Sequence, residues 1–424
     1  MKKFYSTLII IINLSPFSII AQIDYSSPEE QGISSNRLNE VSRISKNLIN
    51  DNKVSNITTI INRNGKIVYF QSFGKREFES DMVIKKNDLY RIYSMTKPIV
   101  SLAIMQLYER ELFQLDDPVE KFLPEFSKIK VLSDDGSLKN PKEMMTIKNL
   151  LNHTAGLSYG WTYHPVDQKY YNAGLYDSKG SDDFISRVTN LPLRFSPSEK
   201  FYYSIATDVL GVLVEKISGE PLDQYLKKHI FDPLGMVDTF FKVPVNKRDR
   251  FIPNYSYNKK TKKAEKLNNE YFSNKPSSRS YYNPEFLSGG GGLVSTAKDF
   301  MIFAESLRNN GEFNGARIIN EETLNLMIKN QLPNGVEFTG SSGEPQNWYG
   351  DSIKFGLGFG IINDPEYLKS SGSVGEYFWS GAAGTFFWID PEKEIIVVTL
   401  IQLMNNPYPI RQQIKEAVYQ SLIE

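Results

Sequence analysis

The sequence of 424 residues contains no cysteine and only three histidines. Without cysteine there is no disulfide, no thiol nucleophile and no thiolate metal ligand, so stability must come from the hydrophobic core. The histidines, His153, His164 and His229, form no H-E-x-x-H or similar ligand spacing, which argues against a metal hydrolase. We therefore expect neither a metal ion nor a cofactor.

Net charge is also lacking, because 49 lysines and arginines balance 49 aspartates and glutamates. No long basic run is present, so the electrostatic footprint needed for nucleic-acid binding is missing and no nucleic-acid partner is expected. Hydrophobic residues make up 40% of the chain and charged residues 23%, which is typical of a globular protein with a sizeable core. No pattern in the sequence predicts an oligomeric state.

The range 1–21 has the pattern of a secretory signal peptide. Two lysines follow Met1, an apolar stretch runs from Leu8 to Ile12 and resumes from Phe17 to Ile20, and a cleavage site follows Ala21. The alternative is an N-terminal membrane anchor, but polar residues and a proline interrupt the roughly 20 apolar residues that a spanning helix needs. We expect an exported protein, periplasmic or extracellular, without stable membrane insertion after cleavage.

Hydrophobic patterns near both ends of the chain predict a sheet with flanking helices. Apolar residues at three- and four-residue spacing predict a helix over 31–50, and two β-branched runs, 57–61 and 67–70, flank the hairpin signal Asn64-Gly65. Near the C-terminus, further apolar runs predict strands over 355–362, 377–379, 384–389 and 394–400, and a closing helix over 409–422.

The middle of the chain has a different pattern. From Lys97 to about Leu234 it is helical, with apolar-periodic stretches over 99–107, 147–151, 209–217 and 225–234. The range 242–284 is polar and is interpreted as a surface insertion, with a hairpin as one option. Strands at both ends with helices between them predict one sheet with a helical region inserted in it, and a site at their junction. After the signal peptide we expect one catalytic domain, 22–424, with an α/β part (22–96 and 286–424) and a helical part (97–285).

Ser94 and Lys97 form an S-x-x-K arrangement. On the first turn of a helix, residues three apart share a face, so the lysine amine can reach the serine hydroxyl. The spacing alone is weak evidence, because it also occurs at Ser72, Ser127, Ser256 and Ser295. Behind Ser94, however, the range 99–107 is apolar nearly all round, which predicts a buried central helix. Burial disfavours the charged form of a lysine, so Lys97 can act as a base.

A second candidate, Tyr203, lies in Phe201-Tyr202-Tyr203-Ser204, directly before an apolar-periodic helix over 206–218. Ser204 is a good N-cap candidate for this helix. Read alone, these tyrosines are more typical of core or rim aromatics than of catalytic groups.

With these motifs in this order, the sequence resembles the serine β-lactamase and penicillin-binding-protein superfamily. Within it, the chain is most similar to class C β-lactamases and to the β-lactamase-fold esterases called family VIII. The superfamily places S-x-x-K first, Y-S-x or Y-x-N about a hundred residues later, and a third element on a C-terminal strand. The resemblance covers nearly all of the mature chain and implies an α/β (α+β) fold, an antiparallel sheet flanked by helices with an inserted helical subdomain. Further matching segments are Leu150 to Leu157, Pro233 to Met236, Gly289 to Leu293 and Gly356 to Gly358.

The resemblance implies a role for each site residue. Ser94 would attack an acyl carbonyl, Lys97 and Tyr203 would share the proton transfers, and water would release the acyl-enzyme. The backbone N–H groups of Ser94 and Ala382 would form the oxyanion hole. Which of Lys97 and Tyr203 is the primary base is left open by the sequence. Three residues of the third element would line the substrate: Trp379, Ser380 and Gly381.

The third element also indicates the subgroup. Penicillin-binding proteins and β-lactamases usually carry K-T-G there, whereas Trp379 cannot supply the cation that commonly helps to bind a β-lactam carboxylate. Ile205 stands where β-lactamases have the asparagine of Y-x-N. Both departures are esterase-like, so the leading hypothesis is a carboxylesterase that acts on small esters.

Three alternatives stay open beside the esterase. An amide-bond hydrolase, either a weak β-lactamase or a D-amino-acid peptidase, would use the same fold. An acyltransferase would share every catalytic residue. A non-catalytic binding or sensor protein would be expected to have lost Ser94, Lys97 or Tyr203, and all three are present.

His153 and Ser158 suggest a different site, a Ser-His-Asp triad, because the range 156–160 spells the G-x-S-x-G of a nucleophile elbow. That motif needs a strand before it and a helix after it. Ser158 instead follows a predicted helix and leads into a loop. We therefore expect both residues to have structural roles.

Overall fold

The computed structural model describes residues 23–267, 280–340 and 352–423. The predicted signal peptide lies outside the described residues. Within them, no helix has both the length and the apolar character that crossing a membrane requires.

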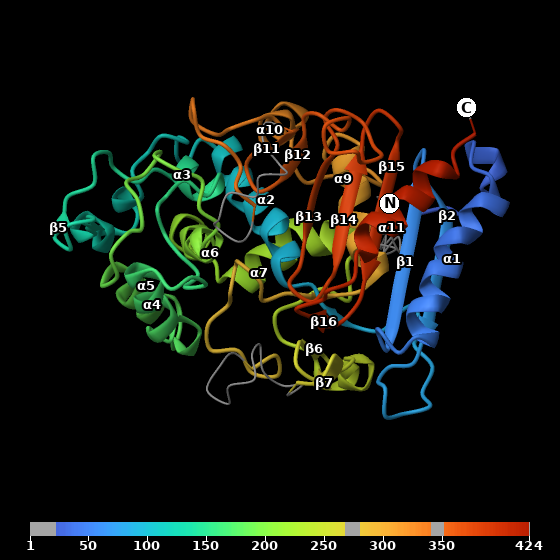
Figure 1. The fold of residues 1–424 in the computed structure, drawn as a ribbon. Helices are drawn as coiled ribbons and strands as arrows, with labels where there is room; N and C mark the ends of the chain where they lie inside the picture. Colours follow the sequence, from blue (N-terminus) through green and yellow to red (C-terminus); the bar gives the residue numbers. More distant parts are fainter. Residues whose placement is uncertain (1–22, 268–279, 341–351, 424) are drawn as a thin grey trace, which may run out of the picture.

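A seven-stranded antiparallel sheet forms the centre of one half of the molecule (Figure 1). Strand β1 from the N-terminal part pairs with β15 from the C-terminal part, so the two ends of the chain build one sheet, as predicted. The strands, in spatial order, are β11 (Ile353–Phe355), β12 (Gly360–Ile362), β13 (Tyr377–Ser380), β14 (Phe386–Asp390), β15 (Ile395–Leu400), β1 (Asn56–Arg63) and β2 (Lys66–Gly74).

Helices cover both faces of this sheet, which explains why its central strands β14, β15 and β1 are buried along nearly their whole length. Along β15, Ile395 and Val397 face helices α1 (Ser35–Asn50) and α11 (Ile410–Gln420), which pack against each other. The alternate residues, Ile396 and Val398, belong to the larger core on the other side, where α9 (Ala297–Arg308) lies against β15. A strand buried on both faces reads as a continuous apolar run rather than an alternating one.

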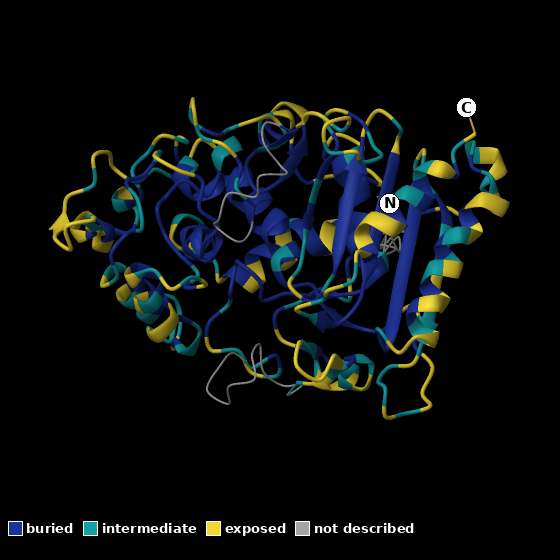
Figure 2. Ribbon diagram, viewed as in Figure 1, coloured by how far each residue is buried: buried dark blue, intermediate teal, exposed yellow. Residues whose placement is uncertain are grey.

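Most of the predicted elements in the sheet half are confirmed. The hairpin turns at Asn64-Gly65, and both residues have positive φ values, 53° and 76°, as this turn requires. Helix α1 begins at Ser35, because the Ser34 side chain caps it, and not at residue 31 as predicted. Figure 2 shows its outward side exposed, whereas the central strands of the sheet are buried.

One predicted strand is wrong, since the range 355–362 forms a hairpin of two strands, β11 and β12. The turn between them contains Gly356 and Gly358. A Cβ on Gly356 would lie 2.0 Å from the carbonyl oxygen of Met327, and Gly358 has a φ of +94°. These two positions require glycine, and the apolar character of the run concealed the turn that they make.

The helical region lies beside the sheet, with the buried helix α2 (Thr96–Glu109) at its centre and α6 (Ala206–Ser218) packed against it (Figure 1). The predicted helix 225–234 is interrupted by a π-helical turn, Lys227–Phe231. The other α-helices of the described residues are α3 (Ile147–Leu151), α4 (Pro165–Asn172), α5 (Ser181–Thr189), α7 (Leu222–Leu226), α8 (Asp232–Leu234) and α10 (Glu321–Met327).

The described part of the polar insertion contains a hairpin, β6 (Tyr255–Asn258) with β7 (Lys263–Lys266), and β16 (Leu403–Met404) adds to it in parallel. The remaining strands form short two-stranded pairs: β3 (Tyr90–Arg91) with β8 (Val294–Ser295), β4 (Val131–Leu132) with β5 (Leu138–Lys139), and β9 (Glu312–Phe313) with β10 (Ala316–Arg317).

Candidate active site

Ser94 lies where an extended segment turns into the central helix. Strand β3 pairs with β8 and fixes the approach, a 3₁₀ turn over Tyr93–Met95 follows, and α2 begins at Thr96. Ser94 thus precedes α2 and does not lie in its first turn. The neighbouring Tyr93 has a φ of 45°, a conformation uncommon for a residue with a side chain, and Asn254 donates to its buried hydroxyl over 2.7 Å. The surrounding structure therefore holds this turn in place.

Lys97 reaches Ser94 as the spacing predicts. Its side-chain Nζ donates to Ser94 Oγ at 3.2 Å, to the Tyr159 hydroxyl at 2.8 Å and to the carbonyl oxygen of Gly290 at 2.7 Å. Lys97 is only 1% exposed, so these oxygens replace water around its amine. Two of the other S-x-x-K serines, Ser72 and Ser256, lie on strands, where residues three apart point to opposite faces.

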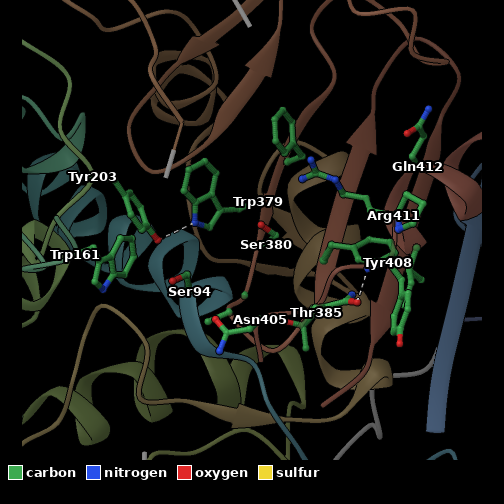
Figure 3. Close-up of a pocket in the computed structure, with 18 of the residues that line it drawn as sticks. Ser94, Trp161, Tyr203, Trp379, Ser380, Thr385, Asn405, Tyr408, Arg411 and Gln412 are labelled. Atoms are coloured by element: carbon green, nitrogen blue, oxygen red, sulfur yellow. Dashed lines mark hydrogen bonds between the residues drawn. The ribbon is translucent and has the colours of Figure 1, made fainter. Parts of the chain in front are cut away.

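Tyr203 stands over the same lysine. The Lys97 Nζ lies 4.6 Å from the centre of the Tyr203 ring, and Ser94 and Tyr203 line the same cavity. The indole Nε1 of Trp379 donates to the Tyr203 hydroxyl at 3.3 Å (Figure 3). Burial raises the pKa of Tyr203 far above its ordinary value, and the bonds from Ser94 and Trp379 offset only part of that rise. The phenol therefore holds its proton near neutral pH.

Tyr159 and Trp161 belong to this site, and the sequence reasoning missed both. Tyr159 accepts from Lys97 and stacks on Trp161, with ring centres 4.6 Å apart and planes 10° from parallel. The buried carboxylate of Asp167 anchors their loop, because it accepts from Ser158 Oγ at 2.7 Å and from the Tyr202 hydroxyl at 2.6 Å. No local pattern marks these aromatics, since Tyr159 is 62 residues from the lysine that it contacts.

His153 and Ser158 do not form a catalytic pair. Ser158 is fully buried and its hydroxyl donates to Asp167, not to a histidine. His153 is buried against the rings of Phe201, Tyr203 and Phe355, and within the described residues its Nδ1 has no hydrogen-bond partner. Burial, and secondly the charge of Lys97, hold the pKa of His153 well below its ordinary value. Both residues have the structural placement that the sequence context predicted.

The glycine-rich loop supplies the third oxygen around Lys97. Asp208, on the first turn of α6, accepts from the backbone N–H of Gly290 at 3.1 Å and from the Ser288 hydroxyl. These two hydrogen bonds hold Gly290 in place, and its carbonyl oxygen accepts from Lys97. A Cβ on Gly290 would lie 2.3 Å from the Asp208 carboxylate, so the loop approaches α6 more closely than any side chain allows.

Two predicted details of the flanking residues are corrected or refined. Helix α6 has Ile205 as its N-cap residue, without a side-chain cap, so Ser204 lies one position too early. The Ser204 hydroxyl instead accepts from the backbone N–H of Ala206 at 3.3 Å. Ile205 is buried and apolar. The chain therefore has no side-chain amide at the position where β-lactamases have the asparagine of Y-x-N.

The third element lies at the end of β13. Trp379 and Ser380 are the last residues of that strand, and the backbone then passes very close to the turn before Ser94. A Cβ on Gly381 would lie 2.4 Å from the carbonyl oxygen of Ile92, which explains why this position is glycine. The next residue, Ala382, lines the same cavity as Ser94.

This cavity has a volume of about 600 Å³ and runs from the catalytic residues to the start of α11. Ser94, Trp161, Tyr203 and the segment 379–382 line one part of it, and Tyr408, Arg411 and Gln412 line the part toward α11 (Figure 3). Over the three described ranges, no three His, Asp or Glu side chains gather as metal ligands. The arrangement is a serine hydroxyl between a buried amine and a phenol, open to a substrate-sized cavity.

Comparison with known proteins places the chain in a family. It matches the Beta-lactamase family over residues 41–419 and belongs to it. An uncharacterized protein of Mycobacterium tuberculosis is 31% identical over 357 residues, covering 82% of this chain and 86% of that protein. Esterase EstB of Burkholderia gladioli is 27% identical, covering 88% of this chain and 92% of EstB.

A solved structure is similar over nearly the whole chain. It is that of EstCE1, described as a hydrolase with promiscuous acyltransferase activity, which is 25% identical and superimposes with a TM-score of 0.75. The likeness covers 91% of this chain and 99% of EstCE1. The superfamily and the β-lactamase/transpeptidase-like fold that the sequence resemblance implied are therefore confirmed.

Proposed function

We propose that this protein is an exported serine hydrolase that works through an acyl-enzyme on Ser94, and that it is a carboxylesterase acting on small esters. The observation that carries the proposal is the hydrogen bond between Lys97 Nζ and the Ser94 hydroxyl, with the Tyr203 ring beside that amine, at the wall of an open cavity. A serine hydroxyl that contacts an amine, with a phenol beside them, is the kind of arrangement that nucleophilic acyl transfer requires.

The proposed reaction has two half-reactions. Ser94 Oγ attacks the ester carbonyl, and its proton passes to the Lys97–Tyr203 pair. The backbone N–H groups of Ser94 and Ala382 stabilise the oxyanion, and a proton from the pair leaves with the alcohol as the carbon–oxygen bond breaks. Water then attacks the acyl-enzyme, gives its proton to the pair, and releases the acid as Ser94 is protonated again.

Trp379 supports esters over amides as substrates. At the position where K-T-G would offer an ammonium group, the indole N–H is directed to the Tyr203 hydroxyl. An alkoxide leaving group needs less help from a proton donor than an amine does, so a neutral third element suits ester cleavage. The similarity to Esterase EstB and to the hydrolase EstCE1 agrees with this assignment.

Acyl transfer to an alcohol or amine is the second candidate, and the cavity favours it. The cavity extends well beyond Ser94 to α11, which leaves room for an acceptor other than water. EstCE1 combines hydrolysis with acyl transfer on a similar fold. Partition of the acyl-enzyme between water and added alcohols measures this activity directly.

The nucleophile is tested by intact mass after reaction with a 4-nitrophenyl phosphonate probe. We expect wild type and Ser158→Ala to gain the adduct mass, Ser94→Ala to gain none, and Tyr203→Phe to react more slowly. Equal labelling of Ser94→Ala would show that the nucleophile is a different residue. Ser158→Ala is the matched control because Ser158 is the other serine with a nucleophile-like motif.

Ester specificity is tested by rates on 4-nitrophenyl butyrate and on a chromogenic cephalosporin. The esterase proposal requires hydrolysis of the ester, lost in Ser94→Ala. Turnover of the cephalosporin alone would instead establish the amide-hydrolase alternative.

Export and domain boundaries are proposed together. We expect cleavage after Ala21, and a mature domain over 22–424 whose α/β part (22–96 and 286–424) carries the inserted helical part (97–285). Expression of the full chain followed by mass analysis of the periplasmic fraction tests the export. A protein that keeps its N-terminal residues and stays with membranes would contradict it.

A further inference from the structure

A second cavity adjoins the catalytic cavity that contains Ser94. It has a volume of about 270 Å³ and lies between α11 and the loop 363–376, which connects β12 to β13. Three residues line both cavities: Phe378, Arg411 and Gln412, of which Figure 3 labels the last two. The proposed acyl chemistry uses no residue that belongs to the second cavity alone, so this space calls for a separate explanation.

The floor of the second cavity is aromatic and belongs to the catalytic strand and its neighbour. Phe378 of β13 and Trp388 of β14 are paired across the sheet, and both line the cavity. The Phe378 ring lies over Gly360 of β12, where a Cβ would be 3.0 Å from the ring. Ile362 and Leu368 add aliphatic walls. Such a surface favours an apolar group, because burial removes apolar area from water.

The carboxylates around the second cavity already have protein partners. Glu376 accepts from Lys415 Nζ at 2.7 Å and from the Tyr419 hydroxyl at 2.9 Å, and Glu416 accepts from Gln412 at 3.0 Å. These are the two carboxylates among the described lining residues. Because protein donors satisfy both of them, a polar ligand has little to gain here, and Lys415 adds its alkyl stem to the wall.

The other two cations of this cavity stay at its rim. Lys369 and Arg411 are exposed, so water solvates their charges, and the Arg411 guanidinium lies 5.6 Å from the centre of the Phe378 ring. Exposed charges are screened and contribute little to binding. The interior of the cavity therefore decides the chemistry of its ligand, and it suits an uncharged apolar group.

The distance from the third element sets the length of that group. Phe378 precedes Ser380 by two residues on β13, which corresponds to about 7 Å along the strand. Ser380 lines the catalytic cavity together with Ser94. An acetyl or butyryl group held at Ser94 therefore ends within the catalytic cavity, whereas the distal carbons of an octyl or octanoyl chain reach the Phe378 floor.

We propose that the second cavity binds the distal part of an uncharged alkyl chain of the substrate, so that the enzyme prefers esters with a medium-length apolar chain. This inference rests on the proposed esterase function and names its substrate class. A dry apolar cavity of about 150 Å³ already holds benzene, so about 270 Å³ has room for several CH₂ groups. Each CH₂ group that leaves water for an apolar site strengthens binding roughly fourfold.

The test compares long and short esters of the same type. One pair is 4-nitrophenyl octanoate and 4-nitrophenyl butyrate, which places the chain on the acyl group. The other is octyl acetate and butyl acetate, which places it on the leaving group. The quantity measured is the ratio of kcat/KM for the long ester to that for the short ester, at concentrations below the solubility of the long one.

Ser371→Phe adds a ring to the wall of the second cavity, because Ser371 lines this cavity and not the catalytic one. We expect the ratio to fall by about tenfold in at least one pair, which is the effect of excluding roughly two CH₂ groups. The matched control is Val374→Phe, since Val374 is an exposed residue of the same loop and lines neither cavity. Its ratio should equal that of wild type.

Ser370→Leu is a smaller change in the same wall, and it should lower the ratio by less. It takes the place of Ser371→Phe if that variant does not fold. The pair in which the ratio falls shows whether the chain belongs to the acyl group or to the alcohol.

Equal ratios in wild type and both filled variants, for both pairs, would overturn the proposal, and so would a wild type that prefers the short ester in both pairs. Failure of the esterase function is recognised separately, because then wild type does not hydrolyse the short esters either. In that case calorimetric titration with 1-octanol still decides the site. Weaker binding to Ser371→Phe than to wild type supports it, and equal binding or no binding refutes it.

Discussion

Replacing Tyr159 with phenylalanine tests whether the oxygens around Lys97 matter for catalysis. Three oxygens lie within hydrogen-bond distance of Lys97 Nζ, the Tyr159 hydroxyl among them at 2.8 Å, and they match the three donors of the ammonium that forms when Lys97 takes up a proton. The change removes that oxygen and keeps the ring, which stacks on Trp161. A hydrogen bond to a charged group contributes about 1.5–3 kcal/mol.

The loss should appear in the rate if Lys97 takes up the Ser94 proton. The ammonium then forms in the transition state, where the missing oxygen leaves one N–H of a buried cation without its partner. About 1.5–3 kcal/mol corresponds to a fall of roughly 10- to 100-fold in kcat/KM. Thermal unfolding should change little, because the aromatic stacking is preserved.

The assay is hydrolysis of 4-nitrophenyl butyrate by Tyr159→Phe, with Tyr170→Phe as the matched control. Tyr170 is also buried, but its hydroxyl has no hydrogen-bond partner within the described residues. Its removal should therefore leave kcat/KM within about twofold of wild type, since no hydrogen bond is lost. A Tyr159→Phe enzyme as active as Tyr170→Phe would refute the role of the Tyr159 oxygen.

Three further predictions concern stability. Gly290→Ala should lower both activity and melting temperature, measured on the same sample, because its Cβ would meet the Asp208 carboxylate at 2.3 Å. The pKa of His153 is held well below its ordinary value by burial and then by Lys97, so below about pH 6.5 the unfolded chain binds a proton that the folded chain rejects. The free energy of unfolding of wild type, measured in urea, should therefore fall by up to about 1.4 kcal/mol per pH unit as the pH decreases. In His153→Phe this pH dependence should be shallower, and identical slopes in the two proteins would contradict the prediction. Lys415→Met should lower the free energy of unfolding, measured in urea at pH 7, by about 3–5 kcal/mol, because Lys415 and Glu376 form a buried ion pair at 2.7 Å. A decrease below about 1 kcal/mol would show that the ion pair does not stabilise the fold.

Periodicity was sufficient to predict the sheet and its flanking helices. The runs that became β1, β15 and α11 were recognisable because each buries a continuous or regularly spaced set of apolar residues. The range 355–362 was misjudged for the same reason. Its apolar residues read as one strand, and the contacts that require glycine at 356 and 358 come from distant parts of the chain.

The candidate site was predictable where its residues are close in sequence or follow a family order. Ser94 and Lys97 are three residues apart, and the positions of Tyr203 and Trp379 followed from the resemblance to the superfamily. Their contacts in the structure agree with that order. The N-cap of α6 was misplaced by one residue, because helix ends are set by backbone geometry that the sequence specifies only loosely.

The sequence by itself determined most of the elements, the family and the pairing of Ser94 with Lys97, because helix and strand periodicity and three-residue spacing are local properties. Only the tertiary structure decided what surrounds that serine. Tyr159, Gly290 and Arg411 come from three distant segments of the chain. No local pattern links them, since their proximity results from packing the helical region against one edge of the sheet. The oxygens around Lys97 and the cavity beside Ser94 exist only after that packing is complete.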